Sequence, residues 1–126
     1  MEQLILHLTG DYLLQSDWMA LNKIKNSKAA AAHAFVYSLT LLLLKPSFVA
    51  WFTIFFTHFL IDRFGLAKYV SFIKTKLAPS TFWPKWKDCC CNGYHKDIPV
   101  WLSTWLLIIS DNTLHLIINY LALKYL

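Results

Sequence analysis

Histidine and aspartate recur four residues apart in three otherwise apolar segments of this sequence. The segments are HLTGDYLLQ at residues 7–15, HFLID at residues 58–62 and DNTLH at residues 111–115. Residues at i and i+4 share one face of a helix, so each imidazole and its carboxylate can reach the same small volume. Such a pair can ligate a divalent metal, or it can form a private hydrogen bond that satisfies both buried groups.

A fourth imidazole, His33, lies in the apolar segment AAAAHAFVY, with no acidic residue in that apolar run. This favours a shared metal over three independent pairs. The candidate ligands are His7, Asp11, His33, His58, Asp62, Asp111 and His115. Imidazoles and carboxylates suit zinc first, with iron or manganese as alternatives, and the lack of Met or Cys in these stripes argues against Cu(I). Because a tetrahedral zinc site uses about four ligands, the larger set allows one ion or two bridged ions.

Membrane-spanning helices are the elements that must position these side chains. The chain has 126 residues, of which 57% are hydrophobic and 15% charged, far from the composition of an average soluble domain. Apolar runs at residues 29–44 and 48–62 are separated only by Lys45-Pro46-Ser47 and predict a helical hairpin. Residues 100–123 exceed the ~20 helical residues that cross a hydrocarbon core. Residues 3–21 form a weaker span, whose polar side chains must face the bundle interior.

We therefore predict an all-α fold in which residues 1–126 form a single integral-membrane domain of four transmembrane helices. Basic residues concentrate after the first predicted span and between the third and fourth, and the positive-inside rule places such loops in the cytoplasm. Both termini are then outside the cytoplasm, in a bacterial inner membrane. Residues 66–77 read either as an amphipathic helix in the cytoplasmic loop, lying on the membrane surface, or as an extension of the third helix. The net charge of +5 is explained by the basic residues of the cytoplasmic loops, so we expect no nucleic-acid partner.

The hairpin also predicts how deep each of these side chains lies in the membrane. His33 and His58 lie about equally far from its turn, at ~1.5 Å per residue, and should be level. Gln15 falls near that level and Asp11 about one helical turn deeper. Asp111 lies deeper along the last helix unless that helix begins above the headgroups, so the last helix is the weakest contributor.

Residues at the cytoplasmic mouth of this site could bind a substrate, and we assign that role to Gln15, Lys23 and Arg63. The two basic side chains could hold a phosphate headgroup, although positive-inside placement alone would also explain them. Asp11 or Asp111 is the candidate general base.

Cysteines and tyrosines elsewhere in the sequence could also have a function. Cys89, Cys90 and Cys91 precede His95, but adjacent cysteines do not match the C-x2-C spacing of zinc sites, and reduced or lipid-modified thiols are favoured. Tyr12 and Tyr37 could donate hydrogen bonds inside the bundle or lie at the membrane interface. The sequence has no Gly-rich phosphate loop, Gly-x-Ser-x-Gly elbow or His-Glu-x2-His pair, so catalysis would depend on the metal.

The segments HLTGDYLLQSDWMALNK, AAAAHAFVY, HFLIDRF and DNTLH together resemble an uncharacterised family of small phage and bacterial integral-membrane proteins. The shared motif is His-x3-Asp-Tyr-x-Leu-Gln near the N-terminus. More distantly, the scattered His and Asp residues are similar to predicted membrane-bound metal-dependent hydrolases of bacteria. The closer family implies a membrane protein and no particular reaction.

Three functions follow as hypotheses. The first is a membrane-embedded metal-dependent hydrolase of a lipid-linked or amphipathic phosphate or ester, in which the metal activates water. The second is a subunit of a transporter or channel for protons or divalent ions. The third is a non-catalytic phage membrane effector. The expected partners are the lipid bilayer and a lipid-linked substrate, with a homo-oligomer left open.

Overall fold

The computed structural model describes residues 1–126 and contains only helices, turns and connecting segments. The predicted all-α fold is confirmed. Contacts divide the chain into two compact units, the first made of Met1–Gly65 with His115–Leu126 and the second of Leu66–Leu114. The long helix α6 (Val100–Tyr125) contributes residues to both units.

The N-terminal segment is a broken helix. α1 (Glu2–Leu8) runs into a π-helical turn, η1 (Thr9–Leu13), and α2 (Asp17–Asn22) begins only after a gap. Ser16 is extended and accepts a hydrogen bond from the Met19 backbone N–H at 3.4 Å, the role of a helix N-cap. Residues 3–21 thus do not form the single continuous helix that we predicted, because the cap at Ser16 starts a new helix.

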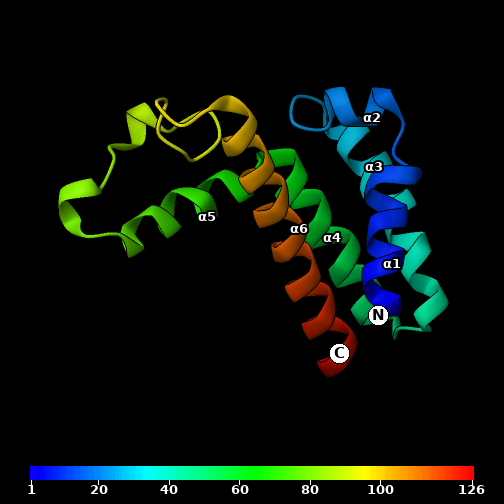
Figure 1. Ribbon diagram of the computed structural model, residues 1–126. Coiled ribbons are helices and arrows are strands. Elements are labelled where there is room, and N and C mark those ends of the chain that lie inside the picture. The colour runs from blue at the N-terminus through cyan, green and yellow to red at the C-terminus, as the bar shows by residue number, and fades with distance from the viewer. The chain divides into compact units, whose positions relative to one another are not determined.

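The predicted hairpin is present. α3 (Ser27–Leu41) continues into the 3-10 turn η2 (Leu42–Leu44) and is followed by α4 (Phe48–Phe64) (Figure 1). Lys45 reverses the chain with a φ of 52°, in the left-handed region. Across the hairpin, the Trp51 indole donates to the Ser38 carbonyl at 3.2 Å.

The C-terminal part of α6 packs in the first unit. Gln3 Nε2 donates to the Leu116 carbonyl at 2.8 Å, and Ser47 Oγ donates to the Leu126 carbonyl at 2.8 Å. An apolar cluster, as we name it, fills the space between these helices; it comprises Tyr37, Leu41, Ile54 and Ala122 with Leu6, Leu44 and Leu123 against them.

A glycine lets the N-terminal segment approach α3 closely. A Cβ on Gly10 would lie 2.7 Å from the Tyr37 ring and 3.2 Å from its Cα. Beside this contact, Thr40 Oγ1 donates to the Leu6 carbonyl at 3.1 Å. Together these contacts bring the next residue, Asp11, against α3.

The second unit contains α5 (Ala67–Lys74), the start of α6, and three 3-10 turns; these are η3 (Thr75–Leu77), η4 (Ser80–Phe82) and η5 (Trp86–Asp88). The Trp86 ring lies 5.1 Å from that of Tyr69 and 5.0 Å from that of Phe72. Ile73 and Leu77 on the same segment are 66% and 90% exposed. Exposed apolar residues beside several lysines are typical of a helix at a membrane surface.

Two helical segments are long and apolar enough to cross a membrane: Ser27–Leu44 and Val100–Tyr125. α4 makes a third only when counted with the helix that follows it. The chain is therefore consistent with a membrane protein that has two or three such spans, whereas four were expected from the sequence.

Candidate metal centre

Six of the seven predicted ligands come together in the first unit, and all six are buried; they are His7, Asp11, His33, His58, Asp62 and His115. They are carried by α1, η1, α3, α4 and α6. Placing one aspartate at the centre of a bilayer costs a free energy of about 2.5–3.5 kcal/mol. The helices therefore gather these groups where they can compensate one another.

Four ligand atoms form an inner quartet, as we name it: His33 Nε2, His58 Nε2, Asp11 Oδ1 and Asp62 Oδ2. The two nitrogens are 3.0 Å apart. His33 Nε2 lies 3.2 Å from Asp11 Oδ1 and 3.1 Å from Asp62 Oδ2. His58 Nε2 lies 3.3 Å and 3.2 Å from the same oxygens. Ligands about 2.0 Å from a tetrahedral zinc ion stand about 3.3 Å apart, so each of these five separations has the length found between two ligands of one ion.

The inner quartet is not explained by hydrogen bonds among its own members. Its distances are short enough, but neither Asp11 Oδ1 nor Asp62 Oδ2 receives a hydrogen bond of acceptable geometry, although both atoms are buried. A buried acceptor without a donor costs about 1–3 kcal/mol, and more when it is charged. Asp11 Oδ1 is such an acceptor, whereas Asp62 Oδ2 has the Lys23 ammonium 3.0 Å away. A cation beside the two imidazoles could compensate both oxygens.

The second oxygen of each carboxylate faces a different histidine, and we call these four groups the outer pairs. His7 Nε2 lies 3.6 Å from Asp11 Oδ2, and His115 Nε2 lies 3.6 Å from Asp62 Oδ1. The two rings have centroids 6.0 Å apart. Each aspartate therefore stands between an inner imidazole and an outer one.

Tyr37 and Asn119 contact the cluster of His and Asp residues on the side that faces the apolar cluster. Tyr37 Oη shares a 2.8 Å hydrogen bond with His7 Nδ1 and accepts another from Asn119 Nδ2. The Tyr37 ring stacks on His58 at 3.8 Å, and His58 stacks on His115 at 4.1 Å. The Nδ1 atoms of His33 and His58 have no hydrogen-bond partner in the protein, so stacking positions the His58 ring.

Comparison with known proteins places the chain in a family. A family model described as "Protein of unknown function (DUF3307)" matches residues 1–83. The chain belongs to this family. The DUF3307 region contains every residue of the inner quartet, whereas His115 and Asn119 lie beyond it. No curated protein and no solved structure matches the chain.

Two groups of three residues in this DUF3307 protein could hold a metal ion: Asp11 with His33 and His58, and Asp62 with His58 and His115. In each group the ligand atoms lie within 4.8 Å of one another. Because both groups contain His58, they belong to one continuous cluster. These buried His and Asp residues are the metal-binding candidates that the sequence predicted.

The three residues proposed for substrate binding have different surroundings. Lys23 Nζ lies 3.0 Å from Asp62 Oδ2, and the Lys23 side chain is 21% exposed. Arg63 donates from Nε to Ser27 Oγ at 2.9 Å and from a terminal nitrogen to the Ile24 carbonyl at 2.6 Å. Gln15 is half-buried, and its Oε1 has no hydrogen-bond partner. Lys23 thus belongs to the cluster, whereas Arg63 connects the end of α4 to the start of α3 and to the segment before it.

The remaining predicted residues lie in the second unit. Asp111 is half-buried on α6 and is in neither group of three ligands, so its role as ligand or base stays a prediction. Cys89 is buried while Cys90 and Cys91 are exposed, and all three are free thiols that form no metal-binding group with His95. Burial raises the pKa of the Cys89 thiol, and the neighbouring Asp88 carboxylate raises it further.

Sequence reasoning left Tyr37 open and missed Asn119. A usable signal was present, because Tyr37 follows His33 by four residues and Asn119 follows His115 by four. This spacing puts each polar residue one helical turn from a histidine, on the same face.

Proposed function

We propose that this chain is a membrane-embedded metal-binding protein whose inner quartet holds a divalent ion, with zinc as the first candidate and iron or manganese as alternatives. The observation that carries this proposal is that His33 Nε2 and His58 Nε2 lie 3.0 Å apart and that each lies 3.1–3.3 Å from Asp11 Oδ1 and Asp62 Oδ2. A central cation would compensate both carboxylates. It would also remove the need for a proton between the two imidazole nitrogens.

The reaction that we propose is metal-dependent hydrolysis of a lipid-linked or amphipathic phosphate or ester. A catalytic zinc site typically uses three protein ligands and keeps one position for water, which the metal makes acidic. Asp62 is already paired with Lys23, which suits a permanent ligand. Asp11, carried by the π-helical turn, is the carboxylate that would accept the proton of the attacking water, and π-turns are frequent at functional sites.

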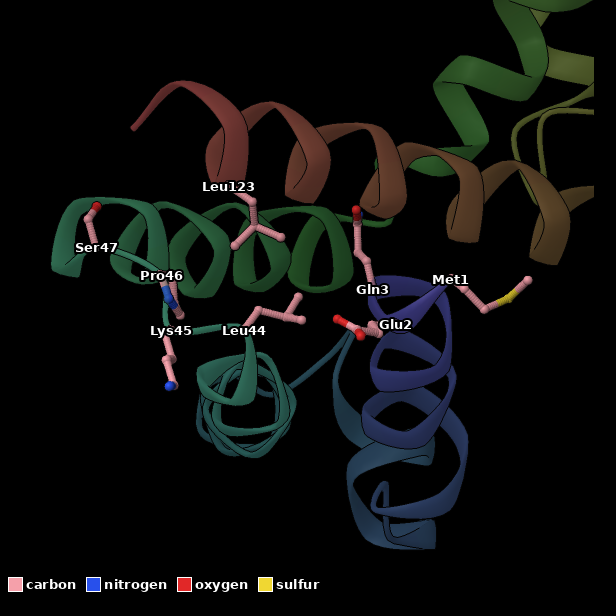
Figure 2. Close-up of a pocket in the computed structure, with 8 residues that line it drawn as sticks. All are labelled: Met1, Glu2, Gln3, Leu44, Lys45, Pro46, Ser47 and Leu123. Atoms are coloured by element: carbon pink, nitrogen blue, oxygen red, sulfur yellow. The ribbon is translucent and has the colours of Figure 1, made fainter.

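The order of residues along the helices favours this hydrolase over an ion conduit. Going from the metal cluster toward the hairpin turn, α3 passes from His33 through Leu41, and α4 passes from His58 through Ile54. Beyond this apolar cluster lies a separate open pocket of about 490 Å³, lined by Met1, Glu2, Gln3, Leu44, Lys45, Pro46, Ser47 and Leu123 (Figure 2). The apolar cluster lies between the two polar regions, as expected for a closed site.

The finer topology is also a proposal. We propose that residues 1–22 lie within the membrane beside α3 with their polar side chains turned toward the cluster, giving four passes with both termini outside the cytoplasm. Contacts of Gly10 and Thr40 with neighbouring segments support this placement.

Two measurements on detergent-purified protein test the proposal. Elemental analysis should find at least one equivalent of a transition metal per chain when no chelator is used. Release of phosphate from a lipid-linked phosphate in mixed micelles should stop after chelation and return when Zn²⁺ is added. His95→Ala is the matched control, because His95 pairs with Asp97 at 3.2 Å outside the cluster. A metal-free preparation would reject the proposal, and metal without hydrolysis would leave a binding protein.

A further inference from the structure

We infer that the outer pairs form a second metal position, so that Asp11 and Asp62 bridge two ions in one dinuclear centre. The inference rests on the proposed metal binding by the inner quartet. It adds a distinct position whose nitrogen ligands are His7 and His115.

The orientation of both carboxylates carries the inference. Asp11 presents Oδ1 to His33 and His58, at 3.2 and 3.3 Å, and Oδ2 to His7, at 3.6 Å. Asp62 repeats this pattern, with Oδ2 toward the same two inner rings and Oδ1 3.6 Å from His115. A carboxylate that serves one ion needs only one of its oxygens. Here both carboxylates direct one oxygen to the inner imidazoles and the other oxygen to an outer imidazole. This is the arrangement of carboxylates that bridge two metal ions about 3.5–4 Å apart.

The outer imidazole of His7 is held as metal ligands usually are. A ligating histidine normally uses its other ring nitrogen in a hydrogen bond that fixes the ring, and His7 Nδ1 makes such a bond with Tyr37 Oη at 2.8 Å. Asn119 fixes that hydroxyl in turn. His115 stacks on His58, with ring centroids 4.1 Å apart. Both outer rings are at least 98% buried, with exposed fractions of 0% and 2%.

Charge balance then narrows the substrate class. Two divalent ions outweigh the two bridging carboxylates, and Lys23 adds a further positive charge at 3.0 Å from Asp62. A bound hydroxide and an anionic substrate would restore the balance. The dinuclear centre therefore favours a phosphate over a neutral ester, because phosphate oxygens can contact both ions.

Counting metal ions tests the second position separately from the first. Chelated, detergent-solubilised full-length protein is titrated with Co²⁺, whose absorption reports each site as it fills. We expect two equivalents for the wild type and for His95→Gln, and one for His7→Gln and for His115→Gln. One equivalent in the wild type, unchanged by His7→Gln, would overturn the dinuclear centre and leave the inner site standing. No binding at all would overturn both.

A spectroscopic measurement on the wild type keeps the inference testable if the variants fail to fold. Two Co²⁺ ions joined by carboxylate bridges are magnetically coupled. The electron paramagnetic resonance signal should therefore grow up to one equivalent and weaken on addition of the second. A signal that grows in proportion through two equivalents would show two unbridged ions and would reject the shared carboxylates.

Discussion

The Nε2 atoms of His33 and His58 lie 3.0 Å apart, although 25 residues separate them in the chain. At this distance only one proton can lie between two imidazoles. That proton is shared by the two rings, so neither Nε2 has a proton left to donate to the carboxylates of Asp11 and Asp62. The arrangement becomes favourable on all sides when a cation lies at the centre.

Loss of either imidazole should therefore have the same effect on metal content. We expect His33→Ala and His58→Ala each to lower metal affinity by more than the roughly 10–100-fold that is typical for residues that only support ligands. Elemental analysis of protein that elutes as a single species measures this, with His95→Ala as the control. Full metal content in His33→Ala, together with loss of metal in His58→Ala, would show that α3 supplies no ligand to the metal.

Gly10→Ala should disturb the cluster from a distance. Its new Cβ would meet the buried Tyr37 ring at 2.7 Å, and forced overpacking of this kind costs about 1–3 kcal/mol. We expect a lower melting temperature and a lower metal content. Gly65→Ala is a matched comparison, because Gly65 has a φ of +57° but no atom within 4 Å of its added Cβ. That variant should lose stability through backbone strain alone and should retain its metal.

Tyr37→Phe should separate the outer histidines from the inner ones. It removes the hydroxyl that bonds His7 and Asn119 while keeping the ring that stacks on His58. Leaving those buried groups without this partner should cost about 1–3 kcal/mol. We expect one Co²⁺ equivalent to bind as in the wild type and the second to bind more weakly. Equal weakening of both would show that Tyr37 supports the whole bundle instead.

The three cysteines should react at different rates in detergent. Cys90 and Cys91 are exposed, whereas Cys89 is buried and its pKa is raised by that burial and by Asp88. A smaller fraction of Cys89 is then thiolate at neutral pH, and thiolate is the form that reacts with maleimide. Mass spectrometry should find two fast labels at pH 7 and a third that accelerates as the pH rises. Three equally fast labels would contradict the buried position of Cys89.

Labelling of intact cells tests the orientation of the chain. With both termini outside, the loop that contains all three cysteines is cytoplasmic. An impermeant maleimide should then leave them unmodified until the cells are opened, whereas a cysteine introduced at exposed Lys45 should react from outside. The reverse pattern would invert the proposed topology.

Local spacing and hairpin geometry predicted much of the cluster. The interval of four residues identified His7 with Asp11 and His58 with Asp62, and the structure places both pairs within 3.6 Å. Equal distance from the hairpin turn predicted that His33 and His58 would be level, which is confirmed. These predictions succeed because helical rise and periodicity are nearly independent of tertiary context.

Other features depend on tertiary contacts that the sequence pattern does not reveal. The break at Ser16 reflects competition between a helix cap and a continuous apolar run, and the cap prevails. The π-helical turn at Thr9–Leu13 lies where Gly10 meets Tyr37, a contact between segments far apart in the chain. The division of each carboxylate between inner and outer imidazoles depends on side-chain rotation, which residue spacing does not determine.

The broken N-terminal segment has a consequence for how the protein is assembled. Residues 1–22 are synthesised before α3 and α4, yet they are too polar and too interrupted to enter a bilayer as an independent helix. The imidazoles that compensate Asp11 belong to α3 and α4, which leave the ribosome later. We expect this segment to wait at the membrane surface and to insert only after the hairpin is in place. Metal supply would then act during biogenesis, because it would determine whether this segment takes its final position.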